Sequence, residues 1–288
     1  MSHSRIAVVT GANKGIGFAI ARNLALEYPK SSFNNGSLLI YLTARNKERG
    51  EEALKALHSD SQLKNAKSLA EDGGLSEVTF HELDINQTKS IQTFRDHLQE
   101  KHPKGIDFVI NNAGLAMTGF DYNVAKETIQ CNYYGTLEAT QDFLSLIKDG
   151  GRLVNVASSS GALSRYPNTI RSKFLGATTV GEITSLMEDF KTSVQDNTYQ
   201  RKGWPEAAYA VSKAGCIGMT KAIAHEAKET GSKTLINVCC PGWVVTDMTK
   251  GKGHKTADEG AKTPVMLALG DIGGVSGEFW RDEQQTDW

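Results

Sequence analysis

Short runs of apolar, often β-branched residues recur along the chain and are separated by longer mixed segments. Their hydrophobicity is continuous rather than alternating, which is typical of strands that are buried on both faces of a sheet. We therefore predict six strands, at residues 6–10, 38–43, 78–83, 108–111, 153–156 and 235–239. A further edge strand is expected at residues 277–280.

The segments between these runs place apolar residues at steps of three and four, the period of an amphipathic helix. The helices predicted on this basis cover residues 15–28, 47–57, 90–101, 125–147 and 207–228. Strands that alternate with helices imply right-handed crossovers and a parallel sheet with helices on both faces. The sequence thus predicts a doubly wound, Rossmann-type α/β fold that forms a single domain over residues 1–288.

Two polar, turn-rich stretches interrupt the alternation. Residues 29–37 (PKSSFNNGS) lengthen the connection into the second strand. Residues 162–203 form a longer insertion, whose middle, 180–194, is expected to be helical. Connections of this length in compact domains are usually functional or packed on themselves. The polar tail RDEQQTDW is expected to be loose.

Composition and charge narrow the function classes. The 288 residues carry 33 acidic and 32 basic side chains, a net charge of −1, which argues against a nucleic-acid-binding surface. No apolar stretch approaches the roughly 20 residues of a membrane span, and the first residues lack the apolar core of a secretory signal. We therefore expect a cytoplasmic protein without a membrane partner. The four cysteines form no CxxC pair, so reduced, mostly buried thiols and no metal site are expected.

A glycine-rich turn follows the first predicted strand, with the sequence Thr10-Gly11-Ala12-Asn13-Lys14-Gly15-Ile16-Gly17. Such a turn lets backbone N–H groups approach a pyrophosphate, and the N-terminus of the helix that follows attracts negative charge. Its GxxxGxG spacing differs from the general GxGxxG fingerprint, and a glycine cluster alone is equally compatible with an ordinary tight turn. The strand before it and the amphipathic helix after it favour a dinucleotide site.

The residue at the end of the second strand determines whether such a fold prefers NAD or NADP. An acidic residue there holds the ribose 2′-hydroxyl of NAD, whereas an arginine suits the 2′-phosphate of NADP. This chain has Arg45 at that place, with Lys14 in the glycine turn and Arg49 one helical turn further on. Solvated surface charge is the alternative interpretation, above all for Arg49. The position of Arg45 favours NADP(H).

A tyrosine and a lysine stand four residues apart in Tyr209-Ala210-Val211-Ser212-Lys213, so they share one face of a helix. A nearby ammonium favours the phenolate, and the phenol then exchanges a proton more readily with a substrate oxygen. YxxxK is common by chance, and a helix surface pair is the alternative. The motif becomes specific only together with other motifs.

Those other motifs are present. Asn111-Asn112-Ala113-Gly114 follows the fourth strand, Asn132 lies in CNYYGT, Ser158 opens SxxG after the fifth strand, and Pro241-Gly242 follows the sixth. Together with TGANKGIG and YAVSK, in this order and over nearly the whole chain, they resemble the short-chain dehydrogenase/reductase family.

The resemblance implies a role for each matching residue. Tyr209 is the general acid that protonates the carbonyl oxygen as hydride arrives, Ser158 binds the same oxygen, Lys213 favours ionisation of the phenol and binds the nicotinamide ribose, and Asn132 holds a water for proton resupply. Ser159 and Ser160 are less favoured alternatives to Ser158. Asn111 would line the adenosine-ribose side of the cleft. Asp84, where a helix cap is the alternative, would accept the adenine amino group beside the Ile85 backbone. The expected NADP(H)-binding set is Gly11, Asn13, Lys14, Gly15, Ile16, Gly17, Arg45, Asp84, Ile85, Asn111, Ala113, Gly114, Tyr209, Lys213, Pro241, Gly242, Val244 and Thr246.

The length of the insertion points to one branch of the family. Ser158 and Tyr209 stand 51 positions apart, whereas this interval is much shorter in common members. The long interval resembles the carbonyl-reductase branch, which implies an NADPH-dependent monomer whose insertion covers the usual oligomerisation face. The expected substrate is a small ketone, aldehyde or quinone.

Two residues after Pro241-Gly242 are candidate substrate contacts. The Trp243 ring and the Met248 thioether would suit a flat apolar carbonyl compound, although packing within the loop explains them equally well. Cys239 and Cys240, beside the cleft, are core thiols or include one reactive thiol. Two other functions stay open: oxidation of a secondary alcohol with NADP, and NADPH sensing without turnover. Arg45 argues against the first, and the complete Asn-Ser-Tyr-Lys set argues against the second.

Overall fold

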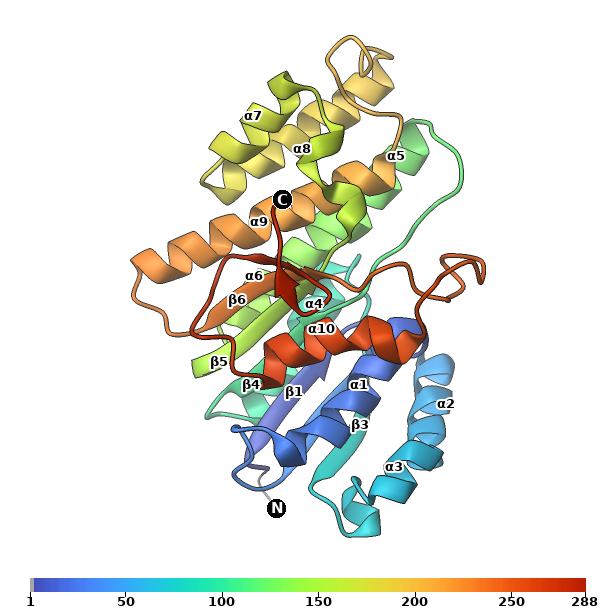
Figure 1. Ribbon diagram of the computed structural model, residues 1–288, viewed down its shortest axis with the longest axis vertical. Helices are drawn as coiled ribbons and strands as arrows, with labels where there is room; N and C mark the ends of the chain where they lie inside the picture. The colour runs from blue at the N-terminus through green and yellow to red at the C-terminus, as the bar shows by residue number, and fades with distance from the viewer. Residues whose placement is uncertain (1–2) are drawn as a thin grey trace.

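The computed structural model describes residues 3–288 (Figure 1). Within that range one sheet has eight strands in the order β3-β2-β1-β4-β5-β6-β7-β8. The strands are β1 (Arg5–Val9), β2 (Leu38–Ala44), β3 (Ser76–Glu82), β4 (Ile106–Asn111), β5 (Ile147–Val156), β6 (Leu235–Cys240), β7 (Phe279–Arg281) and β8 (Gln284–Gln285). The chain order reverses between β1 and β4, and doubly wound sheets bind ligands at the carboxyl ends of the strands at such a switch point.

The strands through β7 pair in parallel, and their side chains feed two separate cores. In β1, Ile6 and Val8 belong to the core on one face, whereas Ala7 and Val9 belong to the core on the other. Both faces are therefore apolar, which accounts for the continuous hydrophobic runs in the sequence. The predicted doubly wound α/β fold is confirmed, apart from one antiparallel pair, β7 with β8, at the edge.

Helices cover both faces of the sheet (Figure 1). One face carries α1 (Gly15–Glu27), α2 (Lys47–His58), α3 (Ser61–Ala66) and α10 (Ala257–Leu269). The other carries α4 (Thr88–Lys101), α5 (Tyr122–Ile129), α6 (Thr136–Leu144) and α9 (Ala208–Glu229). Among residues 3–288 no helix is both long enough and apolar enough to cross a bilayer.

The insertion folds into two helices that pack beyond α9 (Figure 1). They are α7 (Asn168–Gly176), which the sequence pattern did not predict, and α8 (Val180–Gln195), which confirms the helix expected at residues 180–194. A capping box in which Thr179 and Glu182 bond each other's backbone amides fixes the start of α8. From there α8 packs against both α5 and α9.

The prediction of one long helix over residues 125–147 is wrong. The helix starts at Tyr122, passes through a π-helical segment, η3 (Gln130–Gly135), and ends at Leu144, while Ile147 already begins β5. The widened turn fits two contacts: Asn132 bonds the backbone of Leu115, and Gly135 packs on the Ile85 carbonyl. A π-helical turn keeps apolar residues at spacings close to those of an α-helix, so the sequence period does not reveal it.

The expectation of a loose tail is also wrong. Residues 284–285 pair with Trp280 and Arg281 as β8, and the Thr286 amide bonds the Phe279 carbonyl. The tail thus turns back over the molecule, and the chain end lies beside α9 (Figure 1).

Candidate active site and cofactor cleft

The glycine turn between β1 and α1 is narrow because backbone passes close to backbone. Gly11 and Gly15 have φ of +63° and +57°, the left-handed region that favours glycine. A Cβ on Gly11 would lie 2.8 Å from the Ala113 Cα, and one on Gly17 would lie 2.4 Å from the Gly11 carbonyl oxygen. No side chain among the described residues caps the start of α1, so its first amides face the cleft unpaired with a cap. This is the geometry of an anion cradle.

Asn112 and Thr10, for which the sequence predicted no role, hold this turn in place. The Asn112 amide group donates to the carbonyls of Thr10 and Gly11, both at 3.1 Å. The Thr10 hydroxyl accepts the backbone N–H groups of Asn112 and Ala113, both at 3.0 Å. In the sequence, the only indication of this role is that Thr10 and Asn112 lie inside TGANKGIG and NNAG, directly beside the predicted binding residues.

Basic groups gather beside the glycine turn. Asn13, Lys14 and Arg49 line one cavity of about 360 Å³, together with Phe18, Glu52, Ala53 and Ala56. Arg45 is exposed directly after β2. Lys14 Nζ lies 2.5 Å from the Asp247 carboxylate, which belongs to the loop after β6. Lys14 and Arg49 therefore line one cavity beside the glycine turn, and Lys14 has a carboxylate partner that the sequence did not reveal.

The residues after β3 are placed by local contacts. The Asp84 carboxylate accepts the Asn86 amide at 3.0 Å, so it closes its own turn. Ile85 is buried, and its carbonyl oxygen would lie 2.5 Å from a Cβ on Gly135. Gly135 is thus a close-approach position that joins η3 to the predicted adenine side of the cleft.

The side chain of Asn111 points into the interior of the fold, and its expected place beside the adenosine ribose stays a prediction. Its amide group is buried and donates to Thr140 and Asn155 at 3.1 and 3.0 Å, and Asn155 in turn donates to Thr220 at 2.9 Å. This chain of buried polar groups ties β4 and β5 to α6 and α9. The Asn111 Nδ2 group is thus paired, whereas its buried Oδ1 has no hydrogen-bond partner among the described residues.

The two ends of the YxxxK motif lie together on α9. Lys213 Nζ lies 5.8 Å from the centroid of the Tyr209 ring and donates to the Val156 carbonyl at 3.0 Å. Lys213 is only 5% exposed, whereas Tyr209 is half-buried. The end of β5 therefore fixes a buried ammonium beside the phenol.

Asn132 lies in η3 and is fully buried. Its side chain bonds both backbone groups of Leu115 at 2.8 Å and donates to the Ser212 hydroxyl at 3.0 Å. A Cβ on Gly114 would lie 3.1 Å from Asn132 Oδ1 and 3.6 Å from Lys213 Nζ. The structure thus brings Gly114, Asn132 and Lys213 to one place.

Ser158 follows β5 and begins the short 3-10 turn η4 (Ser159–Gly161). Its hydroxyl accepts the Ser160 amide at 3.1 Å and approaches the Ser160 hydroxyl at 3.2 Å. The other candidate serines belong to η4 itself. Ser158 is half-buried at the carboxyl end of the sheet, where Val156 receives Lys213.

The loop after β6 closes over the glycine turn. Thr246 would lie 3.4 Å from a Cβ on Gly15, Val244 is buried against Gly260, and Pro241 is buried while Gly242 has φ of +88°.

The two candidate substrate residues on this loop, Trp243 and Met248, are 51% and 48% exposed, and the Trp243 ring meets the edge of His254 at 4.7 Å. Packing within the loop accounts for only part of either side chain.

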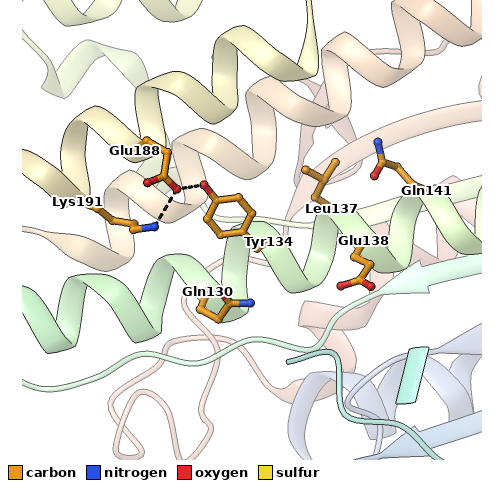
Figure 2. Close-up of a pocket in the computed structure, with 7 residues that line it drawn as sticks. All are labelled: Gln130, Tyr134, Leu137, Glu138, Gln141, Glu188 and Lys191. Carbon is orange, nitrogen blue, oxygen red and sulfur yellow. Dashed lines mark hydrogen bonds and ion pairs between the residues drawn. The ribbon is translucent and has the colours of Figure 1, made fainter. Parts of the chain in front are cut away.

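The four cysteines are buried, and burial raises the pKa of the Cys239 thiol well above its ordinary value. Cys239 is therefore an inert core thiol. A separate cavity lies between η3, α6 and α8, where Tyr134 bonds Glu188 and Lys191 pairs with the same carboxylate (Figure 2). Its lining includes no predicted site residue.

Comparisons with known proteins agree with this geometry. The family model described as short chain dehydrogenase matches residues 5–171 and 196–257, and the stretch between them falls inside the 162–203 insertion. "Carbonyl reductase [NADPH] 1" of Mus musculus is 38% identical, covering 100% of both chains, and "Carbonyl reductase [NADPH] 3" of Rattus norvegicus is 37% identical, covering 100% of this chain and 99% of that one. Salutaridine reductase from Papaver somniferum has a TM-score of 0.80 at 29% identity, covering 96% of this chain and 99% of that chain. With most of its length matched by the family model and full-length relatives above 30% identity, this chain belongs to the short-chain dehydrogenase/reductase family.

Proposed function

We propose that this protein reduces carbonyl compounds to alcohols with NADPH. The observation that carries the proposal is the buried Lys213 ammonium held between the Tyr209 ring and the Val156 carbonyl. A fixed positive charge beside a phenol suits proton donation to a substrate oxygen. The full-length relatives are named as NADPH carbonyl reductases, which supports the same activity.

The cleft fits NADP(H) on its own geometry. Gly11 and Gly17 let the backbone of the turn pack closely, and the start of α1 has no side-chain cap, so its first amides are available to a pyrophosphate. Arg45 and Lys14 supply positive charge for a 2′-phosphate, and no acidic residue replaces Arg45 at the end of β2. Gly114 leaves space beside Lys213, where the nicotinamide ribose would bind.

NADPH, when bound, supplies the hydride, which adds to the carbonyl carbon. The chain supplies the proton and the orientation. Ser158 holds the carbonyl oxygen, and the O–H bond of Tyr209 breaks as its proton moves to that oxygen. The Lys213 ammonium stabilises the phenolate that remains. Asn132, next to Gly114 and Lys213, sits where a water would return a proton from solvent.

Exposed apolar side chains support a bulky, apolar substrate. Met117 follows β4, and Trp243, Val245 and Met248 follow β6, so they lie at the carboxyl edge of the sheet on either side of β5 and Ser158. Such side chains gain by covering an aromatic or alicyclic ketone or a quinone, and gain little from a small polar aldehyde.

We further propose that the protein is a cytoplasmic monomer. Helix α8 packs on α5 and α9, and so covers a helical face that would otherwise be free for a second copy. Light scattering at micromolar concentration is expected to give the mass of one chain. A stable dimer or tetramer would contradict this.

The test of the activity is NADPH consumption with a panel of quinones, aromatic ketones and aliphatic aldehydes, each also measured with NADH. Tyr209→Phe should lose at least a thousandfold in kcat while it keeps NADPH binding, because only the transferable proton is removed (about 4 kcal/mol in the barrier). Tyr134→Phe, in the separate cavity of Figure 2, is the matched control and should keep full activity. Wild-type turnover in Tyr209→Phe would refute the mechanism, and NADPH binding without turnover on the whole panel would refute the function.

A further inference from the structure

The last residue of the sequence, Trp288, lies on the catalytic side of the fold rather than at the sheet edge. Its indole N–H donates to the Gly161 carbonyl at 3.1 Å, and its ring meets Phe174 of α7 edge-on at 5.5 Å. A Cβ on Gly218 of α9 would lie 2.9 Å from the indole ring. The ring therefore occupies a space that only a glycine on α9 leaves open, between the catalytic helix and the insertion.

Gly161 is itself pressed against the catalytic helix. A Cβ there would lie 2.5 Å from the Ala214 nitrogen and 2.6 Å from the Lys213 carbonyl carbon. Backbone thus packs directly on backbone at the residue that stabilises Tyr209. Because both sides of this contact are backbone, a small shift of Gly161 would have to move the backbone of α9 as well.

Gly161 is also the last residue of the turn that holds Ser158. Its N–H donates to the Ser158 carbonyl at 3.0 Å, while the Ser158 hydroxyl accepts the Ser160 amide. Gly161 is buried, so its carbonyl has to find a donor within the protein. Trp288 is that donor. The indole, the Gly161 peptide and the Ser158 turn therefore form one continuous set of hydrogen bonds.

We propose that Trp288 is a positioning residue for carbonyl reduction: its hydrogen bond to Gly161 fixes the turn that aims the Ser158 hydroxyl at the substrate oxygen. The inference rests on the proposed function, since it assigns Ser158 to that oxygen. The β7–β8 hairpin delivers the tryptophan, which gives the ordered tail a role in the active site. A misplacement of about 1 Å at a group that binds the reacting atom costs up to roughly a hundredfold in rate.

Trp288→Phe removes the N–H donor and keeps most of the ring, including its contact with Phe174. We expect kcat, measured at saturating NADPH, to fall three- to tenfold. The dissociation constant of NADPH should stay within twofold, because the glycine turn is untouched. The pH profile of kcat should keep its shape, because Tyr209 and Lys213 keep their partners. Trp288→Tyr, which retains more bulk and also lacks a donor at that place, should behave alike and serves if the phenylalanine variant folds poorly.

Trp280→Phe is the matched control. Trp280 is buried in β7 and donates to Asn237 at 3.3 Å, so this variant loses a comparable indole hydrogen bond away from Ser158. The Trp280→Phe variant should have a lower free energy of unfolding but an unchanged kcat at saturating NADPH. Equal effects of the two substitutions on kcat would overturn the inference and leave Trp288 a packing residue.

Amide hydrogen exchange separates failure of the inference from failure of the proposed function. Exchange at Gly161 and Ala162, whose amides close the turn, should rise at least tenfold in Trp288→Phe and stay unchanged in Trp280→Phe. Unchanged exchange there would overturn the inference whatever the activity. If the wild type lacked Tyr209-dependent reduction, the proposed function would fail instead, and the exchange result would still show whether Trp288 holds the turn.

Discussion

The Lys14 ammonium lies 2.5 Å from the Asp247 carboxylate, and this ion pair joins the glycine turn to the loop after β6. The glycine turn and the loop after β6 are thus connected through Lys14, which the sequence predicts as a 2′-phosphate ligand. Lys14 holds the pKa of Asp247 below its usual value. Both side chains are largely exposed, so water and salt weaken their attraction. If Lys14 binds the 2′-phosphate as proposed, Asp247 competes with that phosphate for the same ammonium.

Asp247→Asn should therefore strengthen NADPH binding two- to fivefold and leave NADH binding unchanged. The substitution frees Lys14 and removes a negative charge near the 2′-phosphate, which NADH lacks. Fluorescence titration of both cofactors at low and high salt measures the effect, which should shrink as salt rises. Weaker binding of both cofactors alike would show instead that the ion pair holds the cleft closed over them.

Arg45→Asp should reverse the cofactor preference. An aspartate at the end of β2 repels a 2′-phosphate and accepts a hydrogen bond from a free 2′-hydroxyl. We expect kcat/KM for NADPH to fall about a hundredfold, or about 2.7 kcal/mol in transition-state stabilisation, with a smaller gain for NADH. Arg49→Asp is the control for a simple change in surface charge and should cost less than tenfold. Similar losses of kcat/KM in the two variants would show that Arg45 does not itself select NADPH over NADH.

Most of the fold and the meeting of Tyr209 with Lys213 were predictable because each depends on local sequence. Two apolar faces make continuous strand runs, as in β1 and β2, and the glycine turn between Thr10 and Gly17 needs small residues at fixed spacing. The tyrosine and lysine of α9 meet because a helix repeats every 3.6 residues. These features carry their reason within a few positions of the chain.

The features that were missed depend on partners distant in sequence. The Asn111 side chain bonds Thr140 and Asn155, and Asn132 in the π-helical turn bonds the backbone of Leu115. The tail is ordered because Trp288 finds a space beside Gly218. No period or motif in the sequence predicts contacts between such distant residues, so the polarity of residues 281–288 alone suggested a loose tail.

Asn111 and Asn112 should respond to substitution in opposite ways, although they are adjacent. Asn111→Ala leaves buried partners in the Thr140–Asn155 chain unsatisfied and should lower the free energy of unfolding by about 2 kcal/mol, with unchanged NADPH affinity in the folded protein. Asn112→Ala releases the glycine turn and should weaken NADPH binding about tenfold with a smaller loss of stability. Urea unfolding and cofactor titration measure both. A specific loss of NADPH affinity in Asn111→Ala would instead support its predicted place in the cleft.

A group of histidines on the face of β2 and β3 that α4 covers makes the stability of the fold depend on pH. Tyr41 of β2 approaches His102 at 2.8 Å and His97 of α4 at 3.5 Å, and the His97 ring packs on His81 of β3 at 4.7 Å. Burial lowers the pKa of His97, and the charges of His81 and Lys101 lower it further against the opposing effect of Glu100. Burial likewise lowers the pKa of His102, with His3, His97 and Lys148 acting in the same direction and Asp107 against it.

The sign of the effect follows from these directions. As pH falls through 6.5, the ordinary value for histidine, the unfolded chain takes up protons that the folded chain does not. The contribution of His97 and His102 to the free energy of unfolding therefore decreases over this window until the lowered folded values are reached, and this contribution is constant below them. His97→Gln removes one of these groups and keeps a polar side chain near Tyr41, so the loss of stability between pH 7.5 and 5.5 should be smaller than in the wild type. His225→Gln, at an exposed position of α9, should leave that loss unchanged. Urea unfolding at the two pH values gives the difference directly, and an equal loss in the wild type and in His97→Gln would assign the pH dependence to other groups.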